Sequence, residues 1–99
     1  MRSYRIRKGR AVERALERVR QALGTQWAQL SMNDIQALEW MYGEVWAHAS
    51  REEWDRLAFS GLRFSHVNKT LDIAHEVVAH KRTAGPAIDE VVEMIRGVS

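Results

Sequence analysis

Two histidines and two carboxylates close together in the second half of this 99-residue chain come nearest to a metal-binding motif. A helical zinc motif needs two histidines four residues apart, so that both face the metal. His75 and His80 are five residues apart, and their directions on a helix diverge by about 140°. Asp72, Glu76 and His80 do share one ridge, but Lys69 shares it too, which favours a solvated face with ion pairs. We therefore predict no metal site and no cofactor.

The remaining chemistry-bearing residues do not form a catalytic motif. The chain has no cysteine, so thiolate ligands, cysteine nucleophiles and disulfides are excluded. His48 and His66 fall at the margins of apolar helix faces, a position typical of half-buried histidines. Neither a nucleophile elbow nor a phosphate-binding loop is present. The sequence therefore predicts a protein that is not an enzyme, with no catalytic residue and no small-molecule substrate.

Positive charge is concentrated at the start of the chain. Residues 1–20 carry eight Lys or Arg and two Glu, whereas the rest of the chain carries seven basic and eleven acidic residues. Dense positive charge suits phosphate neutralisation or docking on an acidic protein surface. The predicted nucleic-acid or acidic-partner binding residues are Arg2, Arg5, Arg7, Lys8, Arg10, Arg14 and Arg18. The alternative is a solvated helix face, because Glu13 and Glu17 can pair with neighbouring arginines.

A second route to nucleic acid is a degenerate helix-turn-helix over residues 51–82. Its recognition helix would present Ser65, His66, Asn68 and Lys69 to the groove. The pattern fits poorly, because Arg56 and Ser60 stand where such a unit usually buries apolar side chains. We keep it as an alternative.

The stretch 31–49 contains two of the four tryptophans and the clearest helical pattern. Its core-facing stripe follows the spacing of an amphipathic helix and comprises Ile35, Leu38, Tyr42, Val45, Trp46 and Ala49. Trp40 points the other way, beside Ala37, Gly43 and Ala47. Small residues allow close approach, and Trp is enriched at binding hot spots. These four residues are a predicted protein interface, unless another helix of the same chain covers them.

Periodicity and capping residues predict an all-α fold, a compact bundle of about five helices in a single domain. The predicted helices span 10–23, 31–49, 51–60, 65–82 and 86–97. Residues 1–9 are predicted to be a basic, mobile N-terminal arm, because Gly9 separates them from the periodic pattern, and 10–99 form the bundle domain. The side chains expected in the core are Leu16, Val19, Leu38, Tyr42, Val45, Trp46, Leu57, Leu71, Ala74, Val78, Val91 and Ile95.

These features lead to two functional hypotheses. The first is a non-enzymatic protein-interaction module, a small inhibitor or adaptor of the kind that phages and plasmids encode, which binds another protein or itself as a homodimer. The alternative is a DNA-binding transcriptional regulator that uses the basic arm and the degenerate helix-turn-helix. No apolar run is long enough to cross a membrane, and no signal peptide is recognisable, so we expect no membrane association and a cytoplasmic location.

Overall fold

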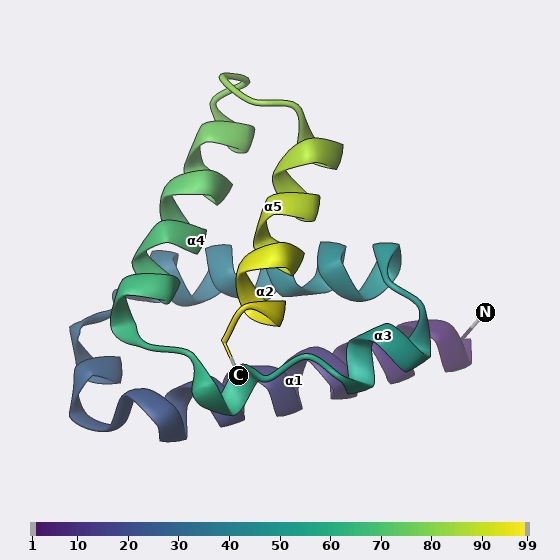
Figure 1. Cartoon of the computed structure of the whole chain (residues 1–99), viewed down its shortest axis with the longest axis horizontal. Coiled ribbons are helices and arrows are strands. Elements are labelled where there is room, and N and C mark those ends of the chain that lie inside the picture. Colours follow the sequence, from purple (N-terminus) through teal and green to yellow (C-terminus); the bar gives the residue numbers. More distant parts are fainter. Residues whose placement is uncertain (1, 99) are drawn as a thin grey trace.

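One central helix, α2 (Met32–His48), organises the packing of the others. The computed structural model describes the backbone of residues 2–98 and the side chains of residues 3–98. In it, α1 (Arg2–Leu23) runs along α2, while α4 (Phe64–Val78) and α5 (Ala84–Arg96) form a hairpin that crosses α2 (Figure 1). The core lies where these two helix pairs meet.

The described residues 2–98 form five α-helices and no strand, so the predicted all-α, single-domain bundle is confirmed. The elements not yet named are the 3-10 segment η1 (Gly24–Gln29), the short helix α3 (Arg51–Asp55) and the 3-10 segment η2 (Phe59–Gly61). Within the same range, no helix is long and apolar enough to cross a membrane.

The predicted start of α2 is confirmed in detail. The Ser31 hydroxyl accepts a hydrogen bond from the Asp34 amide at 3.1 Å, and the Asp34 carboxylate accepts one from the Ser31 amide at 2.9 Å. This reciprocal capping box satisfies amides that have no partner inside the helix. At the start of α3 only half of such a box forms, in which the Ser50 hydroxyl accepts from the Glu53 amide at 3.0 Å. The Glu53 carboxylate pairs instead with Arg96.

Helix α1 begins at Arg2 rather than at the predicted Arg10. The apolar stripe continues upstream, because the Tyr4 ring packs against Trp46 with centroids 5.0 Å apart. Next along the same side, the Lys8 side chain covers Gly43. Gly9 does not interrupt the helix, so residues before it belong to α1 in the structure.

Helix α3 is shorter than the predicted 51–60 and ends at Asp55. Leu57 and Phe59 are both buried. Residues two positions apart on an α-helix point in directions that differ by about 200°. A continuous helix could therefore not turn the side chains of Leu57 and Phe59 into the same core. The irregular backbone at Ala58 and the turn of η2 allow both to be buried.

The predicted core is confirmed except at two positions. All the expected core side chains are buried apart from Leu16, which is half-buried, and Val78, which is 67% exposed. Val78 is the last residue of α4, which ends four residues before the predicted Arg82. The end of α4 lies at the tip of the α4–α5 hairpin, which projects away from α2 (Figure 1), and the preceding residue Val77 still packs against the core.

Candidate anion-binding cleft

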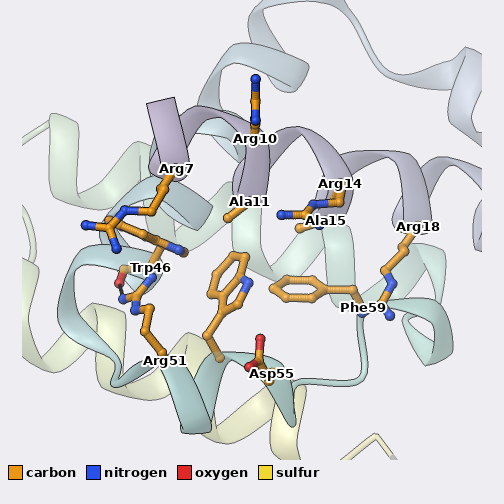
Figure 2. Close-up of a pocket in the computed structure, with 11 residues that line it drawn as sticks. Arg7, Arg10, Ala11, Arg14, Ala15, Arg18, Trp46, Arg51, Asp55 and Phe59 are labelled. Atoms are coloured by element: carbon orange, nitrogen blue, oxygen red, sulfur yellow. Dashed lines mark hydrogen bonds between the residues drawn. The ribbon is translucent and has the colours of Figure 1, made fainter. Parts of the chain in front are cut away.

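An open cleft of about 550 Å³ lies between one flank of α1 and the segment that runs from the end of α2 to η2. Its lining residues are Arg7, Arg10, Ala11, Arg14, Ala15, Arg18, Trp46, Arg51, Trp54, Asp55 and Phe59 (Figure 2). The four arginines of α1 were predicted as binding residues from the sequence. The residues of the opposite wall were not.

The α1 wall is a row of arginines above small residues. Arg7, Arg14 and Arg18 recur at helical spacing and therefore share a flank. Ala11 and Ala15 are buried beside them. Figure 2 shows Arg7 above Trp46 and Arg18 beside Phe59, whereas Arg10 points away from both rings. From Arg7 to Arg18 the helix rises by roughly 16 Å, so the row suits an extended ligand with several negative charges.

The floor of the cleft is aromatic and rigidly packed. Trp46 is 4% exposed and Phe59 is 1% exposed. The Phe59 ring lies 5.1 Å from Tyr42 and 5.0 Å from Trp54, both centroid to centroid and steeply inclined. Such inclined pairs are favourable beyond their buried area. The floor is therefore part of the core and holds the charged rim in place.

Arg51 is fixed on the wall opposite α1. Its guanidinium carbon lies 3.6 Å from the centroid of the Trp46 ring, within the range of a cation–π contact. Its Nη2 donates to the carbonyl of Ala49 at 2.8 Å and to that of Trp46. These carbonyls lie at the end of α2, where the helix dipole favours a cation. Among the described residues, these contacts hold Arg51 in position without a carboxylate partner.

The arginines of the cleft lack acidic partners within the described residues. Within those residues, neither the four arginines of α1 nor Arg51 forms an ion pair. Asp55 is the one carboxylate among the lining residues. The arginines that do pair with carboxylates are Arg20, Arg56, Arg82 and Arg96. Arg20, for example, donates to Glu17 and holds the pKa of that carboxyl below its usual range. Like charges held close together favour binding of an anion.

The other predicted basic residues lie elsewhere. Arg5 and Lys8 line a different groove, between α1 and α2, and the side chain of Arg2 is outside the described part of the chain. The predicted Trp40 interface is not one continuous outer face. Trp40 is 38% exposed, Gly43 is buried under Lys8, and of the other two members Ala37 is half-buried against the core and Ala47 is exposed.

The residues of the alternative recognition helix lie at the start of α4, and two of them, His66 and Lys69, have structural partners. The His66 Nδ1 accepts a hydrogen bond from the Arg63 amide at 2.9 Å, which caps the helix. The Lys69 ammonium lies 4.0 Å from a carboxylate oxygen of Glu90. Ser65 and Asn68 are exposed. The five-residue α3 upstream is shorter than the helix this motif was expected to contain.

No local signal in the sequence marks the second wall of the cleft. Arg51 and Asp55 follow the capping residue Ser50, and charged side chains are common in the first turn of a helix. Trp54 occupies the position at which a hydrophobic staple packs against the residue before the cap. Their meeting with α1 depends on the path of the chain through η2, which sequence periodicity does not specify.

No protein-family model matches the chain, and no curated protein or solved structure shows significant similarity to it. Within residues 2–98, no three His, Asp or Glu side chains are grouped so that they could hold a metal ion. The candidate site is therefore defined by its geometry and charge alone.

Proposed function

We propose that this protein is a non-enzymatic interaction module that docks an acidic segment of a partner protein in the arginine cleft. The observation that carries the proposal is that Arg7, Arg14, Arg18 and Arg51 surround a cleft with an aromatic floor, and that none of the four has a carboxylate partner among the described residues. Arg and Trp dominate the energetics of protein interfaces, and a guanidinium binds a carboxylate through two parallel hydrogen bonds. Blocking or bridging an acidic partner surface would be the action of a small inhibitor or adaptor.

A protein ligand fits the cleft better than a nucleic acid does. Proteins that bind single strands stack bases on open aromatic faces. Here Trp46 and Phe59 are almost fully buried, and Arg51 already covers the Trp46 ring. Asp55 on the far wall would repel a phosphate backbone, whereas a protein segment can place a basic residue against it. A peptide with several carboxylates matches this surface, and one apolar side chain can pack on Trp54, the half-buried aromatic residue of the cleft.

Peptide display against the immobilised protein tests the proposal. We expect the selected peptides to be enriched in Asp and Glu, with an aromatic or aliphatic residue among them. One selected peptide is then titrated by fluorescence anisotropy. Arg14→Glu should weaken its binding by at least about tenfold, or about 1.4 kcal/mol.

The matched control is Arg20→Glu, which makes the same charge change on the same helix outside the cleft. We expect its affinity to stay close to that of the unaltered protein. Peptides without acidic enrichment would contradict the proposal, and so would equal losses in the two variants.

The second candidate function, DNA binding, rests on the same unpaired arginines. A DNA duplex is titrated in parallel over a range of salt concentrations. Binding that is tighter than that of the peptide, and that weakens steeply as the salt concentration rises because binding releases counterions from the phosphates, would favour the DNA-binding regulator instead.

A further inference from the structure

Another open groove lies between α1 and α2 and has a volume of about 640 Å³. Its floor is apolar and includes Val12, Leu16 and Trp40. Trp40 is 38% exposed, an unusual degree of exposure for the largest apolar side chain. Gly9 leaves open space on the α1 side of the groove, whereas the Lys8 side chain lies over Gly43 on the α2 side.

The rim of this groove carries both signs of charge. The basic residues are Arg5 and Lys8, and the acidic ones are Glu13, Glu39 and Glu44. Within the described part of the chain, none of the five takes part in an ion pair. The groove therefore presents positive and negative groups whose partners must come from solvent or from another molecule.

We infer that this groove is the surface on which a second copy of the chain docks. In a two-fold symmetric dimer the same patch faces itself, so that residue i meets residue j and residue j meets residue i. A patch with both signs can then set Arg5 and Lys8 of each copy against the carboxylates of the other. The two Trp40 rings would pack across the shared apolar floor.

The charge pattern favours a second copy over other occupants. Three carboxylates would repel nucleic acid or a strongly acidic protein, and the two basic residues would repel a basic one. A chain of this length also buries a limited share of its surface when folded alone, so association adds burial that it lacks.

The dimer and the arginine cleft do not compete for the same surface. Arg5 and Arg14 are nine residues apart on α1, which places them on opposite sides of the helix at about 180°. A dimer formed through the groove would leave both clefts accessible. It would present two binding sites to a partner with repeated acidic segments, and the effective affinity would rise. The dimer itself requires nothing from the cleft.

Sedimentation measurements on two complementary charge-swap variants test this inference. One variant carries Arg5→Glu and Lys8→Glu, and the other carries Glu39→Lys and Glu44→Lys. We expect the unaltered chain to form dimers as its concentration rises, and each variant alone to remain monomeric because like charges face each other. An equimolar mixture of the two should form dimers, since every swapped charge then meets its opposite.

Trp40→Ala provides a second measurement that does not depend on charge, and it should weaken the dimer by at least about tenfold. Circular dichroism establishes that each variant is folded. A chain that stays monomeric at all concentrations would overturn the inference. So would folded variants that fail to associate when mixed, or that dimerise alone as well as the unaltered chain does.

Discussion

Arginine is used in two different ways in this molecule. In the α4–α5 hairpin, Arg82 donates to Glu90 at 2.6 Å and lies 4.0 Å from Glu76. At the end of α5, Arg96 bonds to Glu93 at 2.8 Å. In the cleft beside α1, the described residues offer no carboxylate partner to Arg14 or Arg18.

The difference separates charge that serves the fold from charge that remains for a ligand. A paired arginine links two elements of the chain, and its charge is neutralised by a carboxylate of the same molecule. An unpaired row of arginines repels itself and so opposes folding electrostatically. The formal net charge of the whole chain, +2, hides this division. A surface becomes a candidate site when its charges have no partner inside the protein.

The largest expected effect concerns the floor of the cleft. Trp46→Ala should lower the free energy of unfolding by about 3–5 kcal/mol, because it leaves a cavity in the core and removes the ring that Tyr4 and Arg51 contact. Denaturant titration followed by circular dichroism measures the loss.

Trp40→Ala is the matched comparison for Trp46→Ala. The Trp40 side chain is 38% exposed, so its removal should cost clearly less stability. Equal losses in the two variants would show that Trp40 is a core residue, and would argue against a docking role for the groove beside it.

A second prediction compares one arginine from each region. Arg82→Ala should cost about 1 kcal/mol of stability, because it removes a bond between the loop that follows α4 and the helix α5 and leaves Glu90 with a weaker partner. Arg14→Ala should be neutral or slightly stabilising, since it removes repulsion from Arg10 and Arg18, each four residues away. Thermal unfolding of both variants at low salt measures the two changes.

Repeating the measurement at high salt tests whether both effects are electrostatic. High salt should shrink both effects, because the interactions involved are partly exposed and therefore screened. If Arg14→Ala proves as damaging as Arg82→Ala, the arginine row has a role within the fold, and the division between the two regions fails.

The fold was predictable from the sequence because its signals are local. Ser31 and Asp34 specify the start of α2 within four residues, and the apolar period specifies which face is buried. The errors came where tertiary contacts decide. Tyr4 extends α1 by packing on Trp46, and the burial of both Leu57 and Phe59 ends α3 early.

The candidate site was predictable only in part. The flank of Arg7, Arg14 and Arg18 follows from helical spacing alone. The opposite wall, with Arg51 and Asp55, comes from a segment that is distant in sequence and is placed by the irregular turn before η2. Without an observable partner for each charge, the sequence could not separate a solvated helix face from a binding surface.

The smallest expected effect tests whether the start of α1 belongs to the cleft. Gly9 lies inside the helix, and a Cβ added there would meet no atom within 4 Å. Gly9→Ala should therefore raise the free energy of unfolding by about 0.5–1 kcal/mol, because alanine loses less backbone entropy in a helix. The control is Gly24→Ala, where φ is +59° and an L-residue is strained, which should cost roughly 1–2 kcal/mol. If Gly9→Ala leaves stability unchanged, residues 1–9 behave as the mobile arm that the sequence predicts, and Arg7 is not held over Trp46. If stability rises, α1 is continuous in solution, and the arginine row is ordered over its whole length before any ligand binds.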